Sequence, residues 1–367
     1  MPEPKRHDAS GLSGLSGTSS TNATSGGPGP IAHGGNLREA AQRYGIALDA
    51  WLDLSTGINP HGYPVPPVPA SAWHRLPEDG DGLAACAARY YGAPDAQHVL
   101  PTAGSQAAIR ALPALLAPGV TAVAALTYGE YAPAFLQAGH PIVPLDTTLE
   151  TLPENVTHAV VANPNNPTAT RVEPERLLGW HAQLAARGGT LIVDEAFADA
   201  LDDPPSVSVA QHVGREGLVV LRSPGKFFGL AGARCGFALA QPARLDALRR
   251  RLGAWTVSGP ARHAVTHALG DQTWQRETRA RLAADGARLV ALLERHGFAP
   301  RATPLFAWVV DRRAHMLHQA LAQRAVWTRL FPTPASLRFG LPGSEAAWRQ
   351  FETALAHSLS ALSPDRQ

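Results

Sequence analysis

The chain has 367 residues, of which 45% are hydrophobic and 17% are charged, so it can fold into one large domain and a smaller one. Its formal net charge of +2 provides no strong positive field, and we expect no nucleic-acid partner. No apolar stretch approaches the ~18 residues that span a bilayer, and we expect no membrane partner.

The first residues differ from the rest in composition. Residues 1–28 are rich in Gly, Ser and Thr and contain little to bury, which predicts a flexible tail. Folded structure is expected from about Ile31. We predict four parts: the tail at 1–28, an N-terminal segment at 29–60, a large domain at 61–270, and a long helix with a small C-terminal domain at 271–367.

Helical patterns and short apolar runs alternate through the large domain. The helical patterns cover 83–91, 105–117, 130–138 and 174–187. The apolar runs are 121–126, 159–162, 191–193, 218–221 and 236–240. Such runs, bounded by Gly, Pro or Asp, are typical of strands buried on both faces of a sheet. We therefore predict an α/β fold with a large, mostly parallel sheet flanked by helices.

The C-terminal part reads as a small α+β domain. A long amphipathic helix is predicted at about 272–297, strands at 306–310 and 337–340, and a last helix near 344–361.

Two other features have a simple reading. Cys86 and Cys235 belong to no CxxC or Cys/His ligand pattern, so we expect buried free thiols, no metal site and a reducing compartment, the cytoplasm. The basic run at 249–251 is expected to lie on a solvated helix face.

Polar residues recur where the predicted strands end. The run 163–168 follows one strand, Asp194 and Glu195 follow the next, and 222–223 follow a third, just before Lys226. Each alone is more often an ordinary turn or helix cap than a site. Ligands of parallel sheets bind outside the carboxyl ends of the strands, so the recurrence at one edge predicts a single site.

These residue types suit pyridoxal phosphate, which needs a lysine amine, an acid at the pyridine nitrogen and a phosphate cradle. Lysine is rare in this chain, and Lys226 lies among apolar neighbours that would lower its pKa by desolvation. We expect Lys226 to form the Schiff base and Asp194 to keep the pyridine ring cationic. Asn166 would donate to the ring hydroxyl, and Tyr128 would stack on the ring.

The phosphate is expected at the start of the helix predicted from residue 105. Free N–H groups and the helix dipole attract anions there. Arg234 and Ser223 would complete the cradle, since a guanidinium can bind two phosphate oxygens. The expected backbone donors are Gly104, Ser105 and Gln106.

The motifs PNNPT, VDEAF and SPGK, with an arginine eight residues after the lysine, resemble those of the fold-type I, aspartate-aminotransferase-like enzymes. The resemblance runs from about residue 31 to the end. It implies the same roles for Asn166, Asp194, Lys226 and Arg234, and a homodimer whose subunits share their active sites. It also implies that Arg338, in SLRFG, binds the substrate α-carboxylate.

The segments AHGGNLREAAQRYG (32–45) and LDLSTGINPHGYP (52–64) are similar to the threonine-phosphate decarboxylase branch of that family, which serves cobalamin biosynthesis. This similarity implies decarboxylation of O-phospho-L-threonine to (R)-1-aminopropan-2-yl phosphate and CO₂. It implies that the N-terminal segment contributes to the substrate site, with Asn36 beside it. The substrate-binding residues would be His33, Gly34, Gly57, Asn166, Arg329 and Arg338.

Two other functions stay open. A histidinol-phosphate type of aminotransferase would use the same cofactor site. A non-catalytic binding module with a relic site is the second alternative, although such proteins often lose the lysine that is present here. The segment 33–36 could also be an ordinary loop.

Three positions depart from the family pattern. Ala169 replaces a usual glycine, which we expect to cost little. Phe197 replaces a tyrosine that many aminotransferases use at the ring hydroxyl, and Leu76 replaces a tyrosine that reaches the partner's cofactor. We also expect Trp73, Tyr90 and Tyr91 to support a dimer interface as aromatic contacts.

Overall fold

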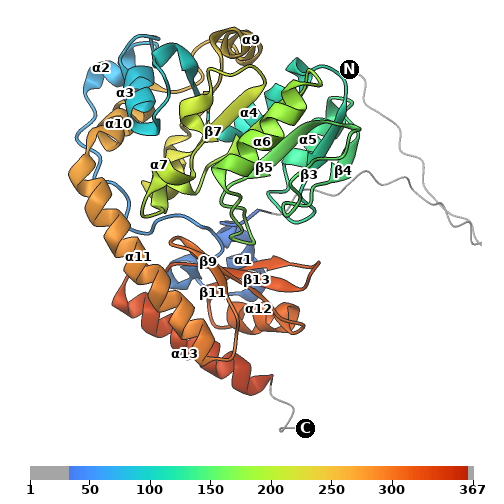
Figure 1. The fold of residues 1–367 in the computed structure, drawn as a ribbon. Helices are drawn as coiled ribbons and strands as arrows, with labels where there is room; N and C mark the ends of the chain where they lie inside the picture. The colour runs from blue at the N-terminus through green and yellow to red at the C-terminus, as the bar shows by residue number, and fades with distance from the viewer. Residues whose placement is uncertain (1–32, 363–367) are drawn as a thin grey trace, which may run out of the picture. The chain divides into compact units, whose positions relative to one another are not determined.

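The computed structural model describes residues 33–362. The predicted tail at 1–28 and the predicted start of folding near Ile31 lie outside the described residues. Within the described part, a large α/β sheet domain precedes a smaller domain built on an antiparallel sheet (Figure 1).

The large sheet has seven strands in the order β2-β8-β7-β6-β5-β3-β4. The five strands from β7 to β4 are parallel to one another, whereas β8 runs antiparallel to both of its neighbours. The strands are β2 Val99–Thr102, β3 Val120–Val123, β4 Ile142–Pro144, β5 Val156–Ala162, β6 Thr190–Asp194, β7 Leu218–Arg222 and β8 Gly236–Leu239. The predicted large, mostly parallel sheet is confirmed.

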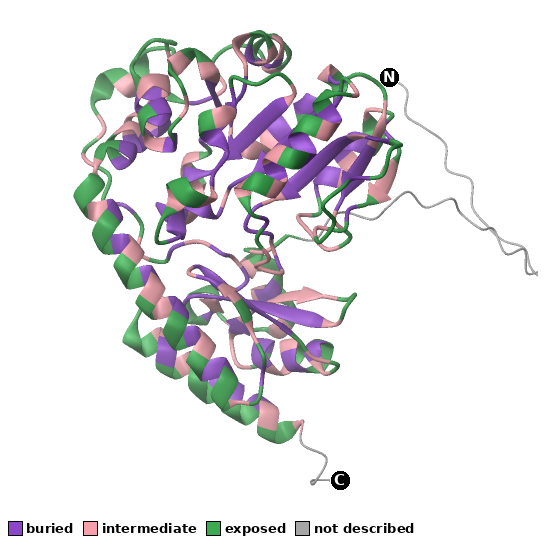
Figure 2. Cartoon of the chain, viewed as in Figure 1, coloured by how far each residue is buried: buried purple, intermediate pink, exposed green. Residues whose placement is uncertain are grey.

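Both faces of this sheet are buried, which explains why its strands read as continuous apolar runs. Alternate residues such as Val160, Ile192 and Val219 pack with one layer of helices. Their neighbours in the sequence, such as Val161 and Val193, pack with the other layer. Figure 2 shows the central strands buried throughout.

The helices of the two layers come from different parts of the chain. The first layer consists of α4 Ser105–Ala111, α5 Tyr131–Gln137 and α9 Pro242–Leu252. The second consists of α3 Leu83–Tyr91, α6 Pro174–Ala185 and α10 Gly259–Gly270. Three short helices join these elements: α2 Ala70–His74, α7 Pro204–Val207 and α8 Pro224–Phe227.

The antiparallel β8 brings its start to the edge at which the parallel strands end. In the register of the sheet, Arg222 pairs with Phe237, and Thr102 pairs with Gly236. A Cβ atom on Gly236 would lie 2.4 Å from the backbone nitrogen of Ser105, so glycine permits this close approach. The ends of β2, β5, β6 and β7 and the start of β8 therefore meet at one edge.

The C-terminal part forms a four-stranded antiparallel sheet in the order β12-β13-β10-β9, covered by helices. Its strands are β9 Arg301–Thr303, β10 Phe306–Val310, β12 Arg329–Phe331 and β13 Ser336–Gly340. Its helices are α11 Gln272–Arg295, α12 Ala314–Ala322 and α13 Glu345–Ala361.

The N-terminal segment forms a separate two-stranded sheet with the C-terminal part and also reaches the large domain. After α1 Leu37–Tyr44, strand β1 Leu52–Asp53 pairs in parallel with β11 Val326–Trp327. Further on, the backbone N–H of Asn59 donates to the carbonyl of Lys226 (2.9 Å), and its side-chain amide donates to Phe227 O (2.8 Å). The segment is thus tied to the turn that carries Lys226.

The predicted helices and strands are confirmed, with shifts of a few residues at their ends. The helix predicted at 105–117 is α4 followed by a 3₁₀ turn at Leu112–Leu115, where Pro113 cannot continue the helical hydrogen bonding. Both cysteines are free and buried, and 249–251 is exposed on α9, as expected. Among the described residues, no helix is long and apolar enough to cross a membrane.

Candidate active site

Lys226 lies on the short helix α8, directly beyond the fully buried strand β7. Its ammonium nitrogen Nζ is 5.8 Å from the centroid of the Phe197 ring. Burial, and then the positive charge of Arg338, lower the pKa of Lys226 to about 8. A side chain with this pKa can present a neutral amine near physiological pH, as the sequence predicted for a nucleophilic lysine.

Asp194 is the last residue of β6 and is almost fully buried. Its Oδ2 accepts a hydrogen bond from the Tyr131 hydroxyl (2.7 Å), and its Oδ1 accepts one from the Ala196 N–H (3.0 Å). Burial raises the pKa of Asp194, and the charge of Lys226 opposes this shift. A cationic N–H group bound to this carboxylate would likewise favour its charged form.

Four of the five residues predicted for the phosphate cradle lie together in the structure: Gly104, Ser105, Ser223 and Arg234. Ser105 Oγ and Ser223 Oγ are 2.8 Å apart. Gly104 has a φ of +73°, and a Cβ there would lie 2.7 Å from Arg234 Nη2. The guanidinium of Arg234 therefore lies against the start of α4, where free N–H groups attract anions.

Gln106 and Tyr128 form a second wall of the same region. The Tyr128 hydroxyl donates to Gln106 Oε1 (2.9 Å), and its ring packs edge to face on Tyr131, with 5.6 Å between centroids. Burial and the charge of Glu130 raise the pKa of Tyr128 to about 12, so it stays a neutral donor. Tyr128 is thereby linked through Tyr131 to Asp194.

Arg338 and Asn166 bring the two sheets together. From β13, Arg338 Nη1 donates to Asn166 Oδ1, and Nη2 donates to the backbone carbonyl of Ser55. Arg338 Nε is buried and has no hydrogen-bond partner. Among the described residues, the side-chain NH₂ of Asn166 donates to no protein acceptor, which leaves it available to donate to a bound group.

Arg329 lies opposite Arg338 on the adjacent strand β12, and the two are paired in the register of the sheet. Burial and the charge of Arg329 lower the pKa of Arg338 to about 9, and burial also lowers that of Arg329. Like charges directly opposite each other in a sheet are destabilising. Bound anions would relieve this repulsion, so the pair suits a ligand with two negative groups.

His33, the first described residue, is held by Glu130, a residue that sequence reasoning missed. His33 Nε2 lies 2.9 Å from Glu130 Oε1, and Arg110 Nη1 lies 3.2 Å from Glu130 Oε2. The His33 ring is also 6.1 Å from that of Tyr128. One sequence signal was available, because Glu130 is the only charged residue among residues 111–145 when histidine is counted as neutral.

The two predicted glycines are required by close packing. A Cβ on Gly34 would lie 2.4 Å from the carbonyl oxygen of Ser55. A Cβ on Gly57 would lie 2.9 Å from the ring of Phe197 and 3.0 Å from that of Phe306. Contact of these glycines with substrate stays a prediction.

The three departures from the family pattern have different consequences. Phe197 is buried against Phe306, with 5.1 Å between ring centroids, and makes an apolar wall beside Lys226. Ala169 has a φ of +57°, a left-handed conformation that costs a non-glycine residue about 1–2 kcal/mol, so the cost is larger than the small one expected. Leu76 is 62% exposed.

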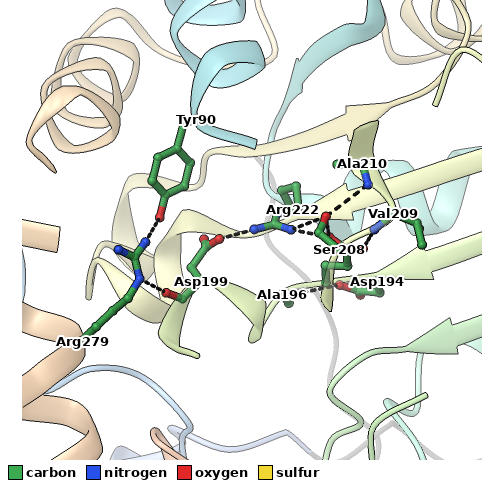
Figure 3. Close-up of polar contacts among 10 residues, drawn as sticks. Tyr90, Asp194, Ala196, Asp199, Ser208, Val209, Ala210, Arg222 and Arg279 are labelled. Atoms are coloured by element: carbon green, nitrogen blue, oxygen red, sulfur yellow. Dashed lines mark hydrogen bonds and ion pairs between the residues drawn. The ribbon is translucent and has the colours of Figure 1, made fainter. Parts of the chain in front are cut away.

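A buried cluster of charges lies at the ends of β6 and β7 (Figure 3). Arg222, the residue before Ser223, forms ion pairs with both Glu195 and Asp199. Burial lowers the pKa of Arg222, but these two carboxylates together raise it above its ordinary value. Because Glu195 follows Asp194, the cluster ties together the ends of β6 and β7.

This cluster also corrects the expectation for Tyr91. Tyr91 is buried in the core with its ring 4.3 Å from the Arg222 guanidinium, so it is not a surface aromatic. Tyr90 is half-buried against the same core, and its hydroxyl lies 3.2 Å from Arg279 Nη2. Trp73 is 67% exposed. A contact of Trp73 or Tyr90 with a partner subunit stays a prediction.

The described residues fit the cofactor that the sequence predicts. An amine of lowered pKa, a buried carboxylate and a glycine-bordered anion cradle meet at one sheet edge. Lys226 would hold the aldehyde of pyridoxal phosphate, Asp194 its ring nitrogen, and the Gly104–Arg234 region its phosphate. The arginine pair on β12 and β13 would face a substrate bound beside it.

Comparison with known proteins gives matches over most of the chain. The family profile for class I and II aminotransferases matches residues 79–354. A threonine-phosphate decarboxylase of Pseudomonas aeruginosa is 51% identical over 327 residues, covering 89% of this chain and 97% of that protein. A threonine-phosphate decarboxylase of a Sinorhizobium species is 41% identical over 342 residues, covering 89% of this chain and 98% of that protein.

A solved structure shares the fold. Histidinol-phosphate aminotransferase of Sinorhizobium meliloti, in complex with pyridoxal-5'-phosphate, superposes with a TM-score of 0.77 at 18% identity. The match covers 91% of this chain and 100% of that one. At this identity the likeness shows the fold alone.

Proposed function

Because the chain belongs to the class I and II aminotransferase family, we propose that it is a pyridoxal-phosphate-dependent decarboxylase of O-phospho-L-threonine. Its products are (R)-1-aminopropan-2-yl phosphate and CO₂, and its metabolic role is in cobalamin biosynthesis. The chain matches two threonine-phosphate decarboxylases over nearly their whole length, and this similarity supports decarboxylation among the reactions of the family.

The observation that carries the proposal is the arginine pair Arg329 and Arg338. The substrate has two anionic groups, a carboxylate and a phosphate, and each needs a cation. Because both groups belong to one small molecule, the two cations must lie close together. Arg338 is assigned to the carboxylate, and Arg329 with His33 to the phosphate. Guanidinium groups bind both kinds of anion through paired hydrogen bonds.

The bound cofactor supplies an electron sink for the bond that breaks at the substrate Cα. Asp194 keeps the pyridine nitrogen protonated. The two arginines fix the rotation of the substrate about Cα, so that the bond from Cα to the carboxylate is the one oriented for cleavage. Positioning of this kind can contribute about 7–11 kcal/mol to lowering the barrier. Lys226, with a pKa of about 8, can carry the proton that replaces CO₂ at Cα.

Phe197 favours decarboxylation over transamination as the reaction of this site. Its ring places no hydroxyl near the cofactor ring and presents an apolar surface beside Lys226. The same fold is used by the histidinol-phosphate aminotransferase of Sinorhizobium meliloti, so the fold does not choose between the two reactions.

The products decide between the two reactions. The purified holoenzyme is incubated with O-phospho-L-threonine, and CO₂ and the phosphorylated amine are quantified with and without 2-oxoglutarate. We expect equal amounts of CO₂ and aminopropanol phosphate, independent of 2-oxoglutarate. A product that requires 2-oxoglutarate and forms without CO₂ would identify an aminotransferase and refute the proposal.

We infer that the working unit is a homodimer. Trp73, Leu76 and Trp255 are 67%, 62% and 63% exposed, and the helices α2 and α10 near them contact each other. Large exposed apolar side chains of this kind mark interaction surfaces.

Light scattering should give about twice the chain mass for the wild type. The double variant Trp73→Ser/Trp255→Ser should shift the measured mass toward that of the monomer. The control Met316→Ser, on α12, should not. A wild-type monomer that is fully active would contradict the inference.

The expected cytoplasmic location stays a prediction. The two buried free thiols accord with a reducing compartment. Cell fractionation would test it.

A further inference from the structure

Glu130 is a buried carboxylate at the edge of the proposed substrate site. Its side chain is 7% exposed, and it directly precedes α5. It lies close to the cofactor region, because the pKa of Tyr128 is raised by burial, then by the charge of Glu130 and then by that of Asp194. A lone negative charge at this place would repel the phosphate of the proposed substrate. The position of Glu130 therefore needs an explanation.

Two basic groups flank the Glu130 carboxylate, one at each oxygen. Oε2 lies 3.2 Å from Nη1 of Arg110, which belongs to α4, and Oε1 lies 2.9 Å from Nε2 of His33. Arg110 offsets the negative charge of Glu130. When His33 is protonated, the three groups together are positive, so they no longer repel a phosphate.

The contact with Glu130 also decides which nitrogen of His33 is left for a ligand. An ionised carboxylate only accepts hydrogen bonds, so Nε2 of His33 donates to it. Among the described residues, Nδ1 makes no hydrogen bond. Because Nε2 keeps its proton, Nδ1 can donate to a phosphate oxygen only when the ring is an imidazolium. Glu130 and a phosphate would therefore bind the same charged ring through its two nitrogens.

A second contact holds the loop that carries His33. The backbone N–H of Gly35 donates to Ser55 Oγ (2.7 Å), and the carbonyl of Ser55 accepts from Arg338 Nη2. The loop is thus held on one side by Glu130 and on the other by the serine that binds Arg338. His33 therefore lies close to the arginine that is assigned to the substrate carboxylate.

We propose that Glu130 is a positioning residue for the substrate phosphate. It holds the His33 ring so that Nδ1 donates to the phosphate, and its charge balances the imidazolium. This inference rests on the proposed function, because it takes His33 as a phosphate-binding residue. Glu130 thereby contributes to the preference of the site for a phosphorylated amine over the corresponding alcohol.

The test compares two amines that differ only in the phosphate. (R)-1-aminopropan-2-yl phosphate and (R)-1-aminopropan-2-ol are titrated into the holoenzyme, and binding is followed by the absorbance of the bound cofactor. Neither probe has a carboxylate, so neither can lose CO₂ during the titration. Glu130→Ala should weaken binding of the phosphorylated amine about tenfold, the value of one charge-assisted hydrogen bond, and change binding of the alcohol less than about twofold.

Three further variants identify the cause of this loss. Glu130→Gln keeps an oxygen for His33 Nε2 without the charge, and should lose less affinity than Glu130→Ala. If Glu130 acts through the histidine, His33→Ala/Glu130→Ala should bind the phosphorylated amine no more weakly than His33→Ala, whereas independent contributions would add. Glu352→Ala removes an exposed carboxylate of α13 that pairs with Arg295, and should change neither affinity.

The possible outcomes separate this inference from the proposed function. A wild type that binds the two amines equally would refute both, because no site for the substrate phosphate would exist. A preference for the phosphorylated amine that survives in Glu130→Ala would overturn the role of Glu130 alone. That role would also be refuted by an equal loss of both amines in Glu130→Ala, or by a similar loss in Glu352→Ala, since either would indicate a general effect of fold or charge.

Discussion

At the scale of single residues, the chemistry depends on how burial changes an ordinary side chain. Lys226 has a lowered pKa because it is buried and because Arg338 is near. Asp194 has a raised pKa because it is buried, and Tyr131 and Ala196 donate hydrogen bonds to it. The charge of each group opposes the shift of the other, because Asp194 raises the pKa of Lys226 and Lys226 lowers the pKa of Asp194.

The lowered pKa of Lys226 predicts a specific pH dependence for its reactivity. The chain has only two lysines, Lys5 and Lys226, so mass spectrometry can follow Lys226 alone. In the cofactor-free protein, the rate of labelling by trinitrobenzenesulfonate should rise with pH and level off above about 8, because only the neutral amine reacts. As a reference for an ordinary lysine side chain, the rate of labelling of Nα-acetyl-lysine should still rise up to about pH 10.

A variant tests the cause of this shift. Arg338→Met removes a positive charge that lowers the pKa of Lys226, so its labelling midpoint should move to higher pH. A wild-type midpoint above pH 10 would show that Lys226 is not in the environment described here.

At the scale of elements, the end of each strand has a structural role as well as a chemical one. The ion pairs of Arg222 join the strand that presents Asp194 to the strand that leads to Lys226. Arg222→Ala leaves two buried carboxylates without their cation, and we expect it to lower the free energy of unfolding by about 3–5 kcal/mol. Urea denaturation measures this.

An exposed ion pair provides the control for that prediction. Arg249 pairs with Asp246 on the surface of α9, and Arg249→Ala should change the stability by less than about 1 kcal/mol. Similar losses in the two variants would show that the buried cluster does not join the strands.

In the loop after β5, a substitution is expected to raise the free energy of unfolding instead of lowering it. Ala169 has a φ of +57°, which glycine adopts without strain. Ala169→Gly should therefore raise the free energy of unfolding by about 1 kcal/mol. The same change at Ala280, an exposed position inside α11, should lower it by about 0.5–1 kcal/mol. Destabilisation in both variants would mean that the strain at residue 169 is relieved in solution.

Sequence patterns predicted elements best where burial is uniform. Strand β7 lies inside the sheet and shows as an apolar run, whereas β2 pairs only with β8, contains Pro101 and was missed. Proline is tolerated on edge strands. The antiparallel direction of β8 leaves no mark in its composition.

Site residues were predictable where a motif fixed their chemistry and not where tertiary packing did. Lys226, Asp194 and Arg234 stand in short motifs at strand ends. Glu130 and Tyr131 were missed because their roles depend on which side of the chain faces the site. Tyr91 was misread for the same reason, since only packing shows that it faces Arg222.

At the scale of the whole molecule, the proposed site depends on three separate segments. The large sheet supplies Lys226 and Asp194, the smaller sheet supplies Arg329 and Arg338, and the N-terminal segment supplies His33. The carbonyl of Ser55 accepts a hydrogen bond from Arg338, and Asn59 donates to the turn that carries Lys226. The N-terminal segment therefore contacts both the arginine proposed to bind the substrate carboxylate and the helix of the proposed Schiff-base lysine.

The central claim is that a phosphorylated amino acid is held by two arginines with separate tasks. The most direct test compares kcat/KM for CO₂ release from O-phospho-L-threonine and from L-threonine in the wild type, Arg329→Ala and Arg338→Ala. Arg329→Ala should lower kcat/KM for the phosphorylated substrate by about 100-fold, the value of roughly two charge-assisted hydrogen bonds, and change that for threonine little. Arg338→Ala should lower both. Loss of the two substrates in equal proportion in both variants would contradict the account.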